Sequence, residues 1–251
     1  MAVVIAPRIV GAGHVEADWQ ASPWLSALPV RAAESLLDGH RRLLVLSPHP
    51  DDETLACAGL MRAAAHAGLE VHLLAATDGE ACYPGDTDWT PQRLREQRPN
   101  EVALALSALG VHAQVRRLGL PDGGLAGCRE ALVREVAALL CPDDLVLAPW
   151  EHDGHPDHDA LGEAALQVAQ SSDACLLQYP VWAWHWLPPD AADAPFDAFR
   201  LELDAHALAA KRRAIACFAS QLGTAHPATP QPILPAHVVE RFLRPFEVYL
   251  A

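Results

Sequence analysis

"RRLLVLSPHPDDE", residues 41–53, is the stretch that decides the fold, because an apolar run gives way abruptly to a histidine and three acids. Residues 41–47 have the length and composition of a buried strand. The alanine-rich residues 52–68 have the length of a helix and end at a glycine. A strand that leads directly into a helix is typical of a βαβ unit. The stretch therefore predicts a parallel sheet with polar groups at the carboxyl end of its first strand.

The same alternation continues along the chain. The predicted strands are 70–79, 113–123, 144–150 and 174–182, and the predicted helices are 91–110, 128–142 and 158–171. Helix 91–110 contains Pro99, which leaves open a break at that point. Short apolar strands that alternate with helices predict a parallel sheet covered by helices on both faces.

The remaining segments are less regular. Residues 199–204 predict a further strand, which we expect at an edge of the sheet, and residues 205–221 predict a helix. The four prolines of 226–235 favour an ordered loop. Residues 236–251 predict a short helix followed by an apolar tail. The first forty residues carry no pattern that we can place.

The charge balance of the chain excludes some partners. The 251 residues include 18 basic and 32 acidic side chains, which give a net charge of −14. Nucleic acids and anionic membranes recruit clustered Lys and Arg, so we expect neither as a partner. We also expect no signal peptide and no membrane span, because the chain lacks apolar runs of the required length.

The cysteines indicate a reducing compartment. None of the six forms a C-x-x-C pair, and they lie in or near apolar segments. Disulfide frameworks are typical of short secreted chains, so we expect free thiols and a cytoplasmic protein. Nothing in the sequence specifies an oligomeric state.

Polar side chains gather where the predicted strands end. In chain order these groups are His49, Asp51, Asp52 and Glu53; Thr77, Asp78 and Glu80; Asp122; His152, His155 and His158; and Trp182, Trp184, His185 and Trp186. The carboxyl ends of parallel strands lie along one edge of a sheet, where such folds bind their ligands. We therefore expect these groups to meet at one site.

The residue types at this edge suit a catalytic metal ion. A catalytic zinc takes three ligands from histidine and carboxylate side chains and keeps a fourth position for water. His49, one carboxylate of the Asp51–Asp52 pair and one histidine of "HPDH", residues 155–158, supply such a set. Water bound to the metal ionises near neutral pH and can attack a substrate, with the other carboxylate as general base. The other histidine of the motif would face the developing oxyanion.

A purely structural interpretation competes with this one. Residues 51–53 begin a helix, where acidic side chains cap free N–H groups and match the helix dipole. Asp157 could likewise cap the helix that follows "HPDH". The recurrence of paired histidine and aspartate at two strand ends favours the metal site.

Several segments resemble a known family. "SPHPDDETLACAG" is similar to the AHPDDE motif of the PIG-L/LmbE-like N-acetylglucosaminyl deacetylases, and "GHPDHDALG" resembles their H-x-x-H motif. "TDGEA", "LGLPDGGL" and "KRRAIACFASQ" also resemble family segments in the expected order, so the resemblance spans about residues 43–221. It implies a Rossmann-like three-layer α/β sandwich with a mostly parallel sheet. We expect one domain over residues 1–251, with residues 222–251 forming a loop and helix at the substrate rim.

The resemblance also implies roles for individual residues. His49, Asp52 and His158 match the family's metal ligands, and the metal is usually zinc, with Fe²⁺ as an alternative. Asp51 matches the general base. His155 matches the histidine that stabilises the oxyanion and protonates the leaving amine.

Five further residues are candidates for the substrate pocket: Glu80, Arg98, Asp122, Trp184 and His185. Each has an alternative interpretation. Arg98 could form a surface ion pair with Glu101, three residues away on a helix. Asp122 could be a turn residue, and tryptophans also fill cores.

Together these features predict a zinc-dependent hydrolase that removes an N-acyl group, most simply acetyl, from an amino-sugar conjugate of the N-acetylglucosamine type. One alternative is an amidase that acts on a thiol-sugar or another small amide conjugate. A second alternative, of another class, is a non-catalytic sugar-binding α/β module.

Overall fold

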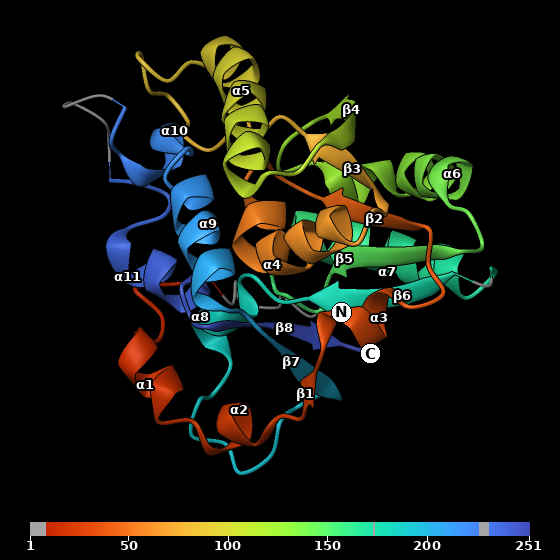
Figure 1. Cartoon of the computed structure of the whole chain (residues 1–251). Helices are drawn as coiled ribbons and strands as arrows, with labels where there is room; N and C mark the ends of the chain where they lie inside the picture. Colours follow the sequence, from red (N-terminus) through yellow and green to blue (C-terminus); the bar gives the residue numbers. More distant parts are fainter. Residues whose placement is uncertain (1–8, 173, 226–230) are drawn as a thin grey trace, which may run out of the picture.

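A single eight-stranded sheet organises the computed structural model, which describes residues 9–172, 174–225 and 231–251 (Figure 1). The strand order is β1-β7-β8-β6-β5-β2-β3-β4. The strands are β1 (Val30–Arg31), β2 (Arg42–Ser47), β3 (Glu70–Thr77), β4 (Ala113–Leu120), β5 (Asp144–Pro149), β6 (Cys175–Tyr179), β7 (Ala198–Glu202) and β8 (Phe246–Leu250). From β6 to β4 every neighbouring pair is parallel, whereas β8 runs antiparallel to both β6 and β7.

Helices cover both faces of this sheet, so the predicted three-layer α/β sandwich is confirmed (Figure 1). The longer ones are α4 (Asp52–His66), α5 (Pro91–Leu109), α6 (Arg129–Leu139), α7 (Pro156–Ala169) and α9 (Ala205–Ile215). The shorter ones are α1 (Glu16–Gln20), α2 (Pro23–Ala27), α3 (Ala33–Leu37), α8 (Ala183–Trp186), α10 (Ala219–Leu222) and α11 (Ala236–Val239), with 3₁₀ turns η1 (Leu125–Cys128) and η2 (Glu240–Phe242).

The side-chain alternation of β2 divides the core into two layers. Leu43 and Val45 point to the face covered by α4, α5 and α9, whereas Leu44 and Leu46 point to the face covered by α6 and α7. Both sets are almost fully buried, which explains why the strand is continuously apolar. Helix α5 runs without interruption through Pro99, so the break that the proline left open does not occur.

The structure differs from the sequence-based predictions at three places. The predicted strand 174–182 ends at Tyr179 and is followed by the short helix α8, because Pro180 cannot continue the sheet ladder. The predicted strand 199–204 corresponds to β7, which lies one place inside the edge, and β1 forms the edge. The apolar tail of 236–251 forms β8, which pairs with β7 over five residues inside the sheet and does not lie at the rim.

Two predictions are not tested by the structure. Residues 226–230 of the predicted proline-rich loop lie outside the described residues. The assignment of residues 1–251 to one domain stays a prediction. Within the described part of the chain, no helix is both long and apolar enough to cross a membrane.

Candidate metal centre and active site

The loop between β2 and α4 sets the geometry of the site. Asp51 begins α4 by accepting backbone hydrogen bonds at its carbonyl, yet its own side chain caps nothing. Its φ of 136° lies in a region that residues other than glycine rarely adopt, and such strain costs of the order of 1–3 kcal/mol. The Glu53 carboxylate stabilises the loop by accepting from the Asp51 N–H (3.2 Å) and the Ser47 hydroxyl (3.0 Å). The acids of this stretch therefore do not serve as ordinary helix caps.

Three side chains, of which Asp52 and His158 are buried and His49 is largely so, direct donor atoms at one another. His49 Nδ1 lies 3.3 Å from Asp52 Oδ2 and 3.3 Å from His158 Nε2, and His158 Nε2 lies 3.2 Å from Asp52 Oδ2. A four-coordinate zinc with bonds of about 2.0–2.1 Å holds its ligands roughly 3.3 Å apart, so this triangle fits one face of a zinc tetrahedron. The donor set and its spacing therefore suit a divalent metal ion.

Carboxylates hold the outer nitrogens of both histidines. His49 Nε2 lies 3.1 Å from Asp157 Oδ2 and 3.2 Å from Asp122 Oδ1, and His158 Nδ1 lies 2.9 Å from Asp153 Oδ2. A carboxylate behind a histidine fixes its ring and its tautomer, which is typical of histidines that bind metal.

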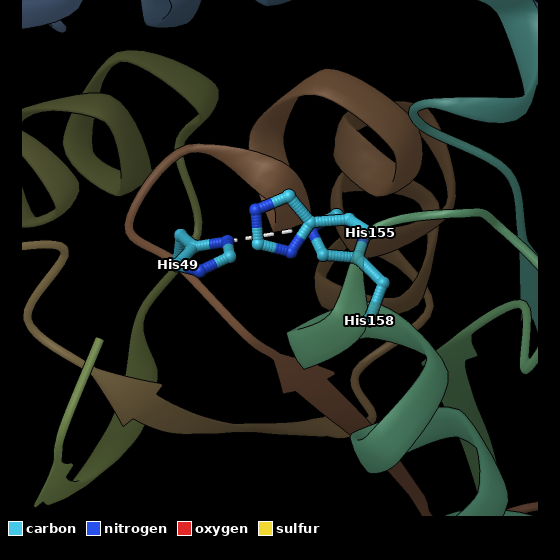
Figure 2. Close-up of side chains that lie close together, drawn as sticks. All are labelled: His49, His155 and His158. Atoms are coloured by element: carbon cyan, nitrogen blue, oxygen red, sulfur yellow. Dashed lines mark hydrogen bonds between the residues drawn. The ribbon is translucent and has the colours of Figure 1, made fainter. Parts of the chain in front are cut away.

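His155 completes a cluster of three histidines, two from the start of α7 and one from the loop after β2 (Figure 2). Its ring centre lies 4.9 Å from that of His49 and 5.0 Å from that of His158, and the Trp182 ring stacks against it at 6.3 Å. His155 Nδ1 accepts a hydrogen bond from the Asp157 N–H, so the proton of the neutral ring lies on Nε2. Burial and the two neighbouring histidines lower the pKa of His155 to about 4, which keeps it neutral.

Arg98 holds the Asp51 carboxylate in place. Its guanidinium donates to Asp51 Oδ2 (3.0 Å), to the Pro50 carbonyl (2.6 Å) and to the Gly79 carbonyl (2.8 Å). A Cβ on Gly79 would lie 1.7 Å from Arg98 Nη1, so only glycine leaves room for this contact. Burial raises the pKa of Asp51 to about 8, although Arg98 opposes the shift. The surface ion pair between Arg98 and Glu101 is not formed.

The pKa values of His158, His49 and Asp52 depend on one another, because the three side chains lie in contact. Burial lowers the pKa of His158, but the Asp52 and Asp153 carboxylates outweigh it and raise this pKa to about 9. Burial lowers the pKa of His49 too, yet hydrogen bonds to Asp122, Asp157 and Asp52 raise it well above 6.5. Burial favours a neutral Asp52, but His158 and His49 hold its pKa well below the usual range. A metal ion would take the place of the protons on the inward nitrogens.

The structure brings most of the predicted site residues together. His49, Asp51, Asp52, His155 and His158 form the centre, as described above. Arg98 and Asp122 contact it directly, and Glu80 adjoins it by accepting from the Asp122 N–H at 3.4 Å.

Trp184 and His185 do not lie in this cluster. Trp184 packs among Trp19, Trp24 and the Arg244 guanidinium, and is 3% exposed. His185 is buried and contacts the Val10 carbonyl. Because α8 turns the chain after β6, it directs these two side chains into the core.

Sequence reasoning did not assign Asp153 or Asp157 to the site, and it expected Trp182 at this edge without choosing it for the substrate pocket. Asp153 accepts hydrogen bonds from the N–H groups of residues 181–183 while it faces His158. Asp157 accepts from the N–H groups of Gly123 and Leu125, and so fastens the loop after β4 to His49. Trp182 faces His155. The only available signal was that Asp153 and Asp157 stand within the same polar motif as the histidines.

Comparison with known proteins finds curated relatives that are named as deacetylases. A 1D-myo-inositol 2-acetamido-2-deoxy-alpha-D-glucopyranoside deacetylase of Kineococcus radiotolerans is 42% identical in an alignment of 165 positions, which covers 53% of this chain and 45% of the relative. The Streptomyces avermitilis protein of the same name is 30% identical over 65% of this chain and 67% of its own length. The chain spans about half the length of most of the curated relatives that it matches.

Solved structures share the fold. The conserved protein TT1542 from Thermus thermophilus is 27% identical, with a TM-score of 0.60 over 83% of this chain and 93% of that one. An N,N'-diacetylchitobiose deacetylase from Pyrococcus horikoshii is 21% identical, with a TM-score of 0.59 over 84% and 79% of the two chains, and shows the fold alone.

A family model covers the segment that carries every residue of the donor triangle. It is the model of PIG-L, described as GlcNAc-PI de-N-acetylase, and it matches residues 44–169. This segment includes both histidine motifs and half of the chain, and the resemblance seen in the sequence is thereby confirmed. The chain belongs to the PIG-L family.

Proposed function

We propose that this protein is a metal-dependent N-deacylase that removes an N-acyl group, most simply acetyl, from an amino-sugar conjugate of the N-acetylglucosamine type. One observation carries the proposal: a triangle of donors with edges of 3.2–3.3 Å lies beside a carboxylate that takes no part in it. A binding module has no need of such a carboxylate, whereas hydrolysis needs a base for water.

His49, Asp52 and His158 would hold the metal ion. Bound there, a divalent metal supplies Lewis acidity, which polarises an amide carbonyl and makes water a better nucleophile. Zinc fits a set of two imidazoles and one carboxylate, and Fe²⁺ binds similar ligands.

Asp51 is the proposed general base. Arg98 fixes its carboxylate, and a pKa of about 8 makes the buried side chain a strong proton acceptor once it is ionised. The proton taken from water is then available for the leaving amine.

His155 is the proposed stabiliser of the oxyanion. Its Nδ1 is engaged by the Asp157 N–H, so Nε2 carries the proton that can be donated. A fixed N–H donor at the developing negative charge lowers the barrier because it need not reorient. Stacking on Trp182 holds the ring in place.

The substrate class follows from the relatives and from the polar groups beside the centre. Relatives carry the names of deacetylases of an inositol glycoside, of N-acetyl-alpha-D-glucosaminyl L-malate and of 2'-N-acetylparomamine. Asp122 and Glu80 are placed to accept hydrogen bonds from sugar hydroxyls, and Trp182 offers an aromatic face. All six cysteines are free thiols, which agrees with the proposed cytoplasmic location.

A metal-loaded activity screen tests the proposal. The panel contains N-acetylglucosaminyl conjugates of inositol and malate, an N-acetylated aminoglycoside and a simple thiol-sugar amide. Appearance of free amine and release of acetate are followed together. We expect turnover of at least one N-acetylamino-sugar. The Asp51→Asn variant should retain its metal and lose about 10²–10⁴-fold in kcat.

Two results would contradict the proposal. One is a wild-type protein that takes up no divalent metal. The other is an Asp51→Asn variant that keeps full activity. Preferred cleavage of the thiol-sugar amide would move the assignment to the alternative amidase.

A further inference from the structure

A buried arginine far from the histidine cluster in sequence has no carboxylate partner within the described part of the chain. Arg241 lies in η2 and is 3% exposed. Its Nη2 donates to the Ala12 carbonyl at 2.9 Å, but its Nε has no hydrogen-bond partner among the described residues. A buried charge that lacks both a counter-charge and a full set of hydrogen bonds is costly, so this guanidinium calls for a further partner.

Two buried carboxylates in this region, Glu16 and Glu247, are already engaged by other cations. Glu16 accepts three hydrogen bonds from Arg244, at 2.8–3.0 Å. Glu247 accepts from Lys211 at 2.8 Å, and its oxygens also accept from two backbone N–H groups of α4 and from the Tyr249 hydroxyl. Across the described ranges, no carboxylate forms an ion pair with Arg241, and this buried region carries one excess positive charge.

The chemistry of Arg241 keeps that charge at neutral pH. Burial and the neighbouring Arg244 lower its pKa to about 10, which is still well above neutrality. The structure therefore cannot relieve the cost simply by releasing a proton.

A small cavity adjoins this excess charge. Its volume is about 20 Å³, and the residues that line it include Lys211, Arg241 and Arg244 together with Glu247. The rest of the lining is mainly apolar and buried, and includes Leu55, Phe242 and Val248. A cavity of this size holds one water-sized guest and is too small for a carboxylic acid or a phosphate.

We infer that this cavity binds a single monoatomic anion, of which chloride is the common physiological member. An anion would supply both the missing counter-charge and an acceptor for Arg241 Nε, whereas a water molecule would supply only the acceptor. The weakly hydrated guanidinium and the apolar walls suit a large halide. The site shares no residue with the histidine cluster, and the inference does not rest on the proposed function.

Thermal unfolding of the full chain tests the inference. Tm is measured in sodium chloride and in sodium gluconate at equal ionic strength, because gluconate is too large for the cavity. A ligand that binds only the folded state raises Tm in proportion to its occupancy. We expect Tm to be about 2–4 °C higher in chloride at about 200 mM, and bromide to reproduce the effect.

Three variants assign the effect to the cavity. Arg241→Gln should abolish the difference between chloride and gluconate, and Arg241→Lys should retain part of it because the positive charge remains. Arg213→Gln removes an exposed positive charge from α9 and should leave the difference unchanged.

A second measurement on the wild-type protein keeps the inference falsifiable even if a variant fails to fold. Crystals grown in bromide should show an anomalous peak within hydrogen-bond distance of Arg241 Nε. Equal Tm values in chloride and gluconate, or a cavity that shows only water in bromide crystals, would overturn the assignment.

Discussion

Two buried polar clusters differ in how far the protein itself satisfies them. In the histidine cluster, carboxylates outnumber cations, and donor atoms of His49, Asp52 and His158 face one another at 3.2–3.3 Å. In the other cluster, Lys211 pairs with Glu247, and each Glu247 oxygen accepts two hydrogen bonds.

This difference in hydrogen bonding indicates which cluster supports the fold and which one serves the proposed reaction. A carboxylate whose oxygens all have donors needs nothing further, so the Lys211–Glu247 cluster belongs to the fold. Inward-facing donors at 3.2–3.3 Å have the spacing of metal ligands, so we assign the histidine cluster to the proposed chemistry. Variants in one cluster should therefore change mainly stability, and variants in the other should change mainly activity.

The largest expected effect is loss of activity on removal of one ligand. His158→Ala should lower kcat/KM on the order of 10⁴-fold, equivalent to about 5 kcal/mol of transition-state stabilisation, because the metal no longer binds. Metal content by mass spectrometry and amine release measure the two effects. His152→Ala changes an exposed histidine of the same loop and is the control. Full activity of His158→Ala would contradict the assignment of the reaction to the histidine cluster.

The second effect concerns the fold. Lys211→Ala leaves the Glu247 carboxylate buried without its cation, which should lower the free energy of unfolding by about 3–5 kcal/mol. Urea denaturation measures the loss. The double variant Lys211→Met/Glu247→Gln removes both charges and should lose less than the single variant. A single variant as stable as the wild type would show that this cluster does not support the fold.

Metal removal comes next. Dialysis against a chelator should lower the stability of the wild-type protein by about 3 kcal/mol relative to protein with zinc at about 100 times its Kd. Calorimetry with and without zinc measures the shift. The same treatment of His158→Ala should change nothing, because that variant has no metal to lose. An identical shift in both proteins would indicate that zinc binds elsewhere.

The smallest effect sharpens the role of a residue outside the triangle. Asp153→Asn removes the charge that faces His158 Nδ1 and should weaken metal affinity about 10–100-fold. Titration with a competing chelator measures the affinity. Asp159→Asn is the control, because Asp159 is an acid of the same motif whose carboxylate accepts from the nearby Gly154 N–H. Equal affinities in the two variants would remove Asp153 from the site.

The sequence predicted the central sheet because that part of the fold follows a local rule. β2, β3 and β5 are largely apolar runs that lead into polar residues, and the helices between the strands have the usual length. His49, Asp52 and His158 could be expected at one edge because parallel strands bring their carboxyl ends together.

The remainder depends on contacts that no local pattern encodes. β8 pairs with β7 across more than forty residues, so residues 246–250 looked like an apolar tail. Trp182, and not Trp184, faces His155 because Pro180 ends β6 early and α8 rotates the chain. Asp153 accepts hydrogen bonds from the backbone N–H groups of residues 181–183. A sequence does not show which backbone groups a side chain will contact.

The position of β8 has a consequence for the order of folding. β8 is the last of the eight strands to be synthesised, yet it lies between β6 and β7 and is the link by which β7 and β1 join the rest of the sheet. The strands that carry the histidine cluster can pair with one another much earlier on the ribosome. We therefore expect a nascent chain that ends before residue 246 to hold an assembled parallel half and an undocked β1–β7 half. Such long-range closure is slow, and it leaves strand edges exposed to aggregation until it is complete.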